Sequence, residues 1–252
     1  MTGGREAAVT QAFVSLTNSM VDGLDVVDLL GGLTGDCARL LDIASAGLLL
    51  ADRRGVLHVV AASSEATRSL ELFQLQREQG PCLDCFHSGS PVSVPDLAQE
   101  AEKWPAFVGA ALKADFASLH AVPLRFKDHT LGALGLFGAE AGALSEDDLH
   151  LGQALAHVAT VALVADRASN DRNVITEQLQ SALTSRVTVE QGKGLLAQLG
   201  GLDMDQAFAA LRRYSRDNNE RLGDVAARLV SRSLPVRTVL DYAVAKGELQ
   251  QT

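Results

Sequence analysis

Residues 180–197 have the sequence QSALTSRVTVEQGKGLLA, and they are followed by DMDQAFAALRRYSR over residues 203–216 and RLGDVAARLV over residues 221–230. Within each segment, apolar residues recur at spacings of three and four, the period at which one face of an α-helix repeats. Arginines occupy the other faces of the second and third segments. The sequence therefore predicts three short helices, packed as a small all-α module with basic outer faces.

The cations of the chain concentrate toward this module. Residues 180–252 hold ten Lys and Arg against eight Asp and Glu, a net charge of +2. The remaining twelve cations and twenty-three acids give residues 1–179 a net charge of −11. This asymmetry is typical of a sensing body joined to a part that meets phosphates. A surplus of two is too small to hold a polyanion by charge alone, so we expect one module to bind weakly.

Length and composition indicate a globular protein of two domains. The chain has 252 residues, of which 47% are hydrophobic and 21% charged. It shows neither a cleavable apolar leader nor an apolar run long enough to span a bilayer, so we expect a cytoplasmic protein with no membrane partner. Three cysteines do not make a disulfide framework and suit a reducing compartment.

The first two thirds of the chain alternate helical and strand-like segments. Two pairs of apolar runs flank short polar turns, DRRG at residues 52–55 and KDH at residues 127–129, which indicates two β-hairpins. This order predicts an α+β fold, an antiparallel sheet with flanking helices. The expected strands are 46–51, 56–62, 91–94, 118–126 and 130–137, and the expected helices are 5–21, 25–42, 65–77 and 104–113.

A long helical segment joins the two parts. Ser145 with Asp148 forms a capping-box pattern, and neither Pro nor Gly occurs between Gln153 and Arg186. Residues 145–168 fit an amphipathic helix packed on its own domain. For residues 173–199 we favour a parallel two-chain coiled coil over the same packing, which predicts a homodimer through residues 145–199. The seam steps alternately by four and three through Ile175, Leu179, Ala182, Arg186, Val189, Lys193 and Leu196.

Two family resemblances rest on particular motifs. The pattern Arg186-x-x-Val-Glu-Gln-x-Lys-Gly-x-Leu, with AFAALRRYSR and LGDVA after it, resembles the ANTAR domain of bacterial transcription antitermination regulators. Residues 15–165 resemble a GAF domain, through the order of elements, Gly80-Pro81-Cys82, and the segment PVSVPDL at residues 91–97. We therefore expect a GAF-like sensor domain over residues 1–168, a helical or coiled-coil linker over 169–185, and a three-helix ANTAR domain over 186–252.

The resemblance implies a dimer that presents two ANTAR domains to paired RNA hairpins in a nascent transcript, so that a terminator cannot form. Arginine suits RNA because its planar fork grips phosphate or a guanine edge and stacks on unpaired bases. The residues that we expect to bind RNA are Arg186, Gln191, Lys193, Gly194, Arg212, Arg213, Arg216 and Arg221. The family usually has alanine where this chain has Gly192, so we expect a softer helix at the RNA face.

Cys82 and Cys85 form a Cys-x-x-Cys motif with His87 two residues further on. Structural zinc needs four ligands and no second such pair is present, so we expect no metal. A thiol redox pair is an alternative to two packed apolar side chains. The sequence has no cofactor motif, and the ligand or signal of the GAF domain is not determined by it. We expect no enzyme activity. The rival functions are a DNA-binding helix-turn-helix regulator and a cysteine-dependent GAF-type methionine sulfoxide reductase.

Overall fold

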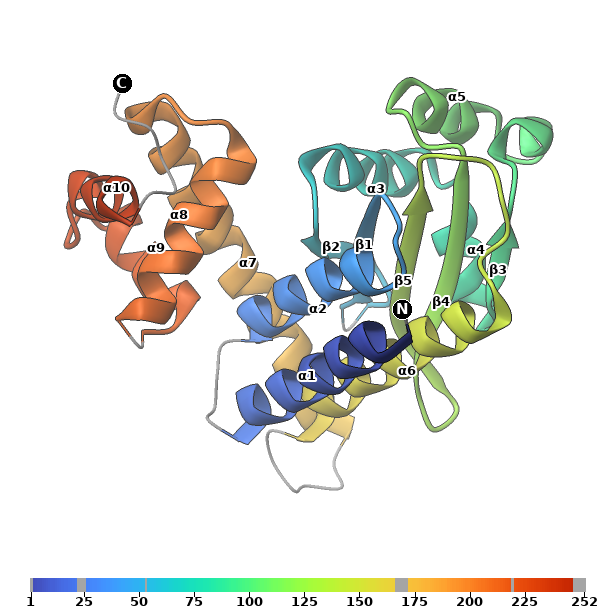
Figure 1. Cartoon of the computed structure of the whole chain (residues 1–252), viewed down its shortest axis with the longest axis horizontal. Helices are drawn as coiled ribbons and strands as arrows, with labels where there is room; N and C mark the ends of the chain where they lie inside the picture. The colour runs from blue at the N-terminus through green and yellow to red at the C-terminus, as the bar shows by residue number, and fades with distance from the viewer. Residues whose placement is uncertain (1, 22–25, 53, 166–171, 219, 247–252) are drawn as a thin grey trace. The chain divides into compact units, whose positions relative to one another are not determined.

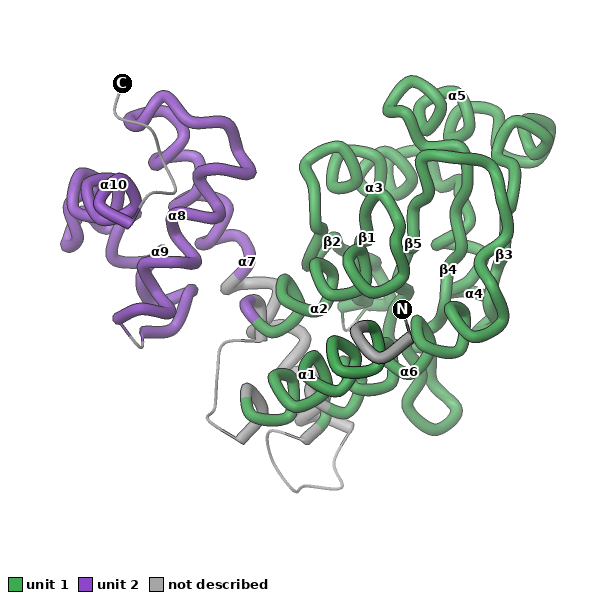
Figure 2. Tube along the Cα trace, viewed as in Figure 1, with its two compact units in different colours: residues 1–23, 29–180 green, residues 24–28, 181–252 purple. Residues whose placement is uncertain are grey.

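A computed structural model of the protein describes residues 2–21, 26–52, 54–165, 172–218 and 220–246. The chain divides into two compact units, which Figure 2 draws in different colours. Unit 1 consists of residues 1–23 and 29–180, and unit 2 of residues 24–28 and 181–252. The domain boundaries expected at residues 168/169 and 185/186 stay a prediction.

Unit 1 is built on a five-stranded antiparallel sheet with the order β2-β1-β5-β4-β3. Both predicted hairpins are confirmed, because β1 pairs with β2 and β4 pairs with β5. The strands are β1 Ser45–Ala51, β2 Leu57–Ala62, β3 Val92–Val94, β4 Ser118–Phe126 and β5 His129–Gly138. The first hairpin turns at Gly55, whose φ of 78° favours glycine, and the Asp52 carboxylate accepts from two backbone N–H groups of the turn.

Helices cover both faces of this sheet, as Figure 1 shows. One face carries α3 Glu65–Arg77, α4 Pro81–Ser88, the 3₁₀ helix η1 Leu97–Glu100 and α5 Pro105–Lys113. Their apolar side chains share a core with Leu49, Ala133 and Phe137 of the sheet. The other face carries α6 Glu146–Ala165, whose Gly152 lies against Leu136, and α1 Thr2–Val21 packs on α6. The predicted α+β class is therefore confirmed.

Local signals in the sequence set the starts of these helices. Ser64 caps α3 by accepting a hydrogen bond from the Thr67 amide, and Pro81 and Pro105 begin α4 and α5. Ser145 accepts from the Asp148 amide at 3.1 Å and donates to the Asp148 carboxylate at 2.6 Å, as the capping-box pattern predicted. The helix α2 Val26–Leu40 buries Leu30, Leu33 and Cys37.

Unit 2 contains the C-terminal part of α7 Arg172–Gly200, then α8 Met204–Asp217, α9 Leu222–Val230 and α10 Val236–Ala245. The predicted three-helix module corresponds to α7, α8 and α9. The fourth helix, α10, was not predicted, and it packs on α8. Its Val239 shares one core with Val189, Leu211 and Val225. Asp203 and Gln206 form a complete capping box at the start of α8.

The predicted coiled-coil seam is divided by what surrounds its members. Ile175, Leu179 and Ala182 lie outside the described side chains, as residues 166–171 between α6 and α7 lie outside the described chain. The four later members, Arg186, Val189, Lys193 and Leu196, are all buried within this chain. Val189 and Leu196 belong to the core of unit 2. A seam between two chains over residues 186–196 would therefore compete with packing inside the chain. Among the described helices, none combines the length and apolar character needed to cross a membrane.

Candidate nucleic-acid interface and sensor core

Two of the predicted RNA-contacting residues on α7 are buried. Arg186 is 7% exposed and Lys193 is 2% exposed. Arg186 Nη2 lies 2.7 Å from Glu190 Oε1, and Lys193 Nζ lies 2.9 Å from Glu190 Oε2. Spacings of three and four residues put the three side chains on one helix face, so the Glu190 carboxylate lies between the two cations. The structure thus gives Arg186 and Lys193 an internal partner, and their contact with RNA stays a prediction.

The other predicted residues on α7 occupy a different face. Gln191 is exposed, and Gly194, three residues further, has open space where a side chain would begin. Gly192 between them is buried, and an added Cβ would come within 3.1–3.2 Å of the Cβ and Cα of Ala226 on α9. This glycine lets α7 and α9 approach closely, and the expectation that it gives a softer helix at the RNA face stays a prediction.

The three arginines of α8 differ in exposure and in their partners. Arg216 is exposed. Arg213 is exposed and donates from Nε to Asp217 Oδ2 at 2.8 Å, and the same oxygen accepts from the Tyr242 hydroxyl of α10 at 2.9 Å. Arg212 is partly buried and donates from Nε to Asp28 Oδ1 at 2.8 Å. Arg216 is therefore better placed than Arg212 to meet a polyanion.

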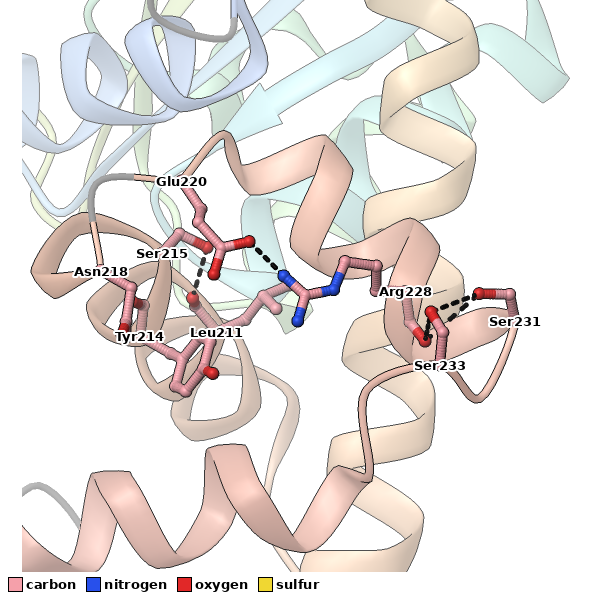
Figure 3. Close-up of polar contacts among 8 residues, drawn as sticks. All are labelled: Leu211, Tyr214, Ser215, Asn218, Glu220, Arg228, Ser231 and Ser233. Atoms are coloured by element: carbon pink, nitrogen blue, oxygen red, sulfur yellow. Dashed lines mark hydrogen bonds and ion pairs between the residues drawn. The ribbon is translucent and has the colours of Figure 1, made fainter.

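Arg221 directly precedes α9, and the residue before it has two partners outside the helix. It is exposed and occupies the N-cap position of α9. Beside it, Glu220 forms an ion pair with Arg228, and the Glu220 amide donates to the Ser215 carbonyl oxygen at 2.9 Å. Figure 3 shows this pair between the end of α8 and the Ser231 and Ser233 hydroxyls, which both donate to the Arg228 carbonyl oxygen. Arg221 is thus exposed at the N-terminal end of α9.

The cysteine motif lies in the core of unit 1. Cys82 and Cys85 are fully buried on α4, and both are free thiols. Burial raises the pKa of Cys85 to about 12, and burial together with the Glu71 carboxyl raises the pKa of Cys82 well above its ordinary value. Because the thiolate is the reactive form, these surroundings disfavour thiol chemistry. A redox role for the pair stays a prediction.

Sequence reasoning missed the group that lies beside this motif. Glu71 lies in α3, which the sequence predicts as a helix over residues 65–77, and its side chain is fully buried. Gln74 Nε2 donates to Glu71 Oε2 at 2.8 Å, and Cys82 Sγ lies 3.5 Å from Glu71 Oε1. Gln74 Oε1 also accepts from the Cys82 amide at 3.2 Å, which joins α3 to the first turn of α4. Burial raises the Glu71 pKa from 4.5 to about 8.

One signal was available in the sequence for this site. Gly47 and Gly135 interrupt two strand-like apolar runs, and a glycine inside a strand often marks a close approach by another group. What the sequence does not show is that the two glycines face one another. Within the described part of the chain, no three His, Cys, Asp or Glu side chains come together as a metal site.

Family models match both parts of the chain. A GAF domain model matches residues 23–164, and an ANTAR domain model matches residues 177–230. The ANTAR match ends before α10 begins at Val236. No curated protein matches the sequence.

Solved structures resemble unit 1 in fold. The GAF domain of a phosphoenolpyruvate-protein phosphotransferase from Acinetobacter superposes with a TM-score of 0.53 at 12% identity, covering 68% of this chain and 99% of that one. A GAF domain of a phosphoenolpyruvate-protein phosphotransferase from Coxiella burnetii gives a TM-score of 0.49 at 15% identity, covering 64% of this chain and 96% of that one. With more than half of its length matched by the GAF model, the chain belongs to the GAF domain family and carries an ANTAR domain C-terminal to the GAF domain.

Proposed function

We propose that this protein is an RNA-binding transcription antitermination regulator, in which the GAF domain receives a signal and controls how the ANTAR domain is presented to RNA. The observation that carries the proposal is the ANTAR match over residues 177–230, which coincides with the helices α7, α8 and α9. These helices carry the exposed arginines Arg213, Arg216 and Arg221. Joined to a sensor domain, such a module suits a regulator better than an enzyme, and an RNA partner suits a cytoplasmic protein.

The RNA surface that we propose consists of the exposed members of the predicted set, Gln191, Arg213, Arg216 and Arg221, together with the partly exposed Gly194. Arginines at a polar surface bind phosphates mainly through charge, so each contact contributes modestly and is weakened by salt. One module with three exposed arginines should therefore bind weakly. Two modules joined in a dimer gain affinity through effective concentration, which supports recognition of two hairpins in one transcript.

The dimer that we propose uses the α7 helix before Arg186, and α6 as well. Val161 of α6 is 51% exposed, so this helix keeps an apolar side chain available for a partner. Light scattering on the full chain at micromolar concentration is expected to give twice the mass of one chain. A monomer that still binds two-hairpin RNA at full affinity would contradict this part of the proposal.

The RNA proposal is tested by fluorescence anisotropy with a leader RNA that contains two short-loop hairpins. Arg216→Ala and Arg221→Ala are each expected to weaken binding and to lower the dependence of log affinity on log salt by about one ion. Arg237→Ala is the matched control, because Arg237 is an exposed arginine of α10 beyond the ANTAR match. Lys193→Ala is unsuitable, since Lys193 is buried against Glu190 and its loss would disturb the fold.

The same assay distinguishes the rival functions. Duplex DNA that competes better than hairpin RNA would favour a helix-turn-helix regulator. Turnover of methionine sulfoxide that disappears in Cys82→Ser would favour a reductase, a role that the buried thiols with raised pKa values do not support. The signal is best sought by native mass spectrometry of protein from its host, which would detect a retained small molecule in the GAF domain.

A further inference from the structure

A row of small residues crosses the sheet of unit 1 below α3 and α4. Gly47 of β1 and Gly135 of β5 lie directly opposite each other in the antiparallel register. Their outer partners are Ala62 of β2 and Ala121 of β4, so four neighbouring strands carry only glycine or alanine along this row. We call this row the small-residue channel, because no side chain there extends beyond a Cβ, whereas large apolar groups lie elsewhere in the same core.

The carboxyl group of Glu71 occupies this channel. A Cβ added at Gly47 or at Gly135 would come within 2.8 Å of Glu71 Oε1, and one at Gly135 would also come within 2.8 Å of Cys82 Sγ. The carboxyl therefore rests directly on the sheet backbone. A longer side chain at either position would displace it.

Among the described residues, those that the contacts place beside this carboxyl carry no positive charge. They are Gln74 on its own helix, Cys82 on α4, the two glycines of β1 and β5, and the ring of Phe137 near Gly135. The cations of α3 have other partners, because Arg68 pairs with Glu65 and Arg77 lies over the Phe73 ring. An ionised carboxylate here would keep two donors but would lose most of its hydration, which is the larger effect.

We propose that Glu71 is a proton-dependent latch: it is a neutral carboxylic acid in the folded sensor unit, and its ionisation loosens α3 and α4 from the sheet. The carboxyl releases its proton to solvent and the anion then favours states in which water reaches the channel. Gln74 extends the effect to the first turn of α4, because it bonds both the carboxyl and the Cys82 amide. The latch lies in the GAF domain and does not depend on the proposed RNA role.

Infrared spectroscopy of the full chain, with ¹³C-labelled glutamate, tests the protonation state directly. We expect the carbonyl band of a protonated carboxyl at pH 6.5, absent in Glu71→Gln and retained in Glu102→Gln, whose side chain is exposed. A wild-type spectrum without this band at pH 6.5, or a band that survives in Glu71→Gln, would overturn the proposal.

Hydrogen exchange tests the loosening. If opening exposes an ordinary carboxyl, the opening equilibrium of α3 and α4 rises by up to tenfold per pH unit between about pH 5 and pH 8. After correction for intrinsic exchange, we expect that rise in wild type and a flat profile in Glu71→Gln. Equal pH dependence in the two proteins would overturn the latch.

A second variant keeps the test valid if Glu71→Gln does not fold. Cys82→Ala preserves the carboxyl and removes the thiol donor that favours its ionised form. The protonated band is then expected to persist to higher pH than in wild type. Its loss at lower pH than in wild type would count against a neutral Glu71 in this channel.

Discussion

Glu71 in unit 1 and Glu190 in unit 2 are both helical glutamates whose carboxyl groups are largely shielded from water, and their surroundings differ in charge. Glu190 lies between Arg186 and Lys193, and its carboxylate oxygens are 2.7 Å and 2.9 Å from the two cationic groups. Glu71 faces an amide, a thiol and two glycines, so burial favours its neutral form. The two glutamates thus differ in their neighbours, because two cations contact Glu190 and uncharged groups contact Glu71.

The largest effect that we expect follows from removing the carboxylate of Glu190. Glu190→Gln removes the carboxylate that both Arg186 and Lys193 contact, and we expect unit 2 to lose about 3 kcal/mol of its free energy of unfolding. Both tyrosines, Tyr214 and Tyr242, lie in unit 2, so tyrosine fluorescence in urea follows this unit.

The control for that variant is Glu220→Gln, which removes the more exposed pair with Arg228. It is expected to cost less than about 1 kcal/mol. Equal losses in the two variants would mean that the ion pairs of Glu190 with Arg186 and Lys193 contribute no more to stability than a surface ion pair.

The pH dependence of unit 1 is the second prediction. The folded-state pKa of Glu71, about 8, lies above its ordinary value of 4.5, so the folded protein binds more protons than the unfolded chain between these values. The stabilisation is complete below about pH 4.5, declines as the pH rises, and is lost above about pH 8.

Between pH 5.5 and pH 7.5 the free energy of unfolding of unit 1 should therefore fall by about 2–3 kcal/mol relative to Glu71→Gln. The single tryptophan, Trp104, is buried in unit 1 and its fluorescence reports this transition. Parallel pH profiles for wild type and variant would show that Glu71 is ionised in the folded state.

The third prediction concerns the channel below Glu71. Gly135→Ala places a methyl group against Cys82 Sγ and Glu71 Oε1, and we expect a loss of about 1–3 kcal/mol from overpacking. Gly142→Ala, where nothing lies within 4 Å, should change stability by less than about 0.5 kcal/mol. If Trp104 fluorescence in urea gave both variants the same midpoint, the tight fit of the carboxyl would be refuted.

The smallest effect is expected on α7. Gly194→Ala meets open space and should stabilise unit 2 by about 0.5–1 kcal/mol, because alanine favours the helix. Gly192→Ala should gain less or lose stability, since its methyl group meets Ala226 on α9. Urea unfolding followed by tyrosine fluorescence compares the two, and a larger gain for Gly192→Ala would contradict the close helix contact.

The sequence predicted the elements with local signals and missed those that depend on tertiary neighbours. The hairpins, the capping box at Ser145 and the proline-started α5 are confirmed because each signal lies within a few residues. The missed α10 does carry a helical pattern after Pro235, because Val236, Val239, Leu240 and Ala243 occupy positions i, i+3, i+4 and i+7. That pattern covers only eight residues, and it lies beyond the ANTAR-like motif.

The candidate sites were less predictable than the fold. The sequence shows that Arg186 is four residues before Glu190 and Lys193 three residues after it, and the two ion pairs follow from this spacing. The burial of Arg186 and Lys193 does not, because an amphipathic helix has the same pattern whether its stripe meets a second chain or its own unit. The environment of Glu71 depends on a register between strands that are 88 positions apart at Gly47 and Gly135.

The close contact at Gly192 has a mechanical consequence. An α-helix of 29 residues, such as α7, is about 43 Å long. At Gly192 no side chain of α7 separates its backbone from Ala226 of α9. Few side-chain atoms could therefore rearrange between the two helices at this point. A rotation of α7 about its own axis would be transmitted to α9 instead of being absorbed by side-chain rearrangement. Arg221, at the N-cap of α9, would then move together with α7.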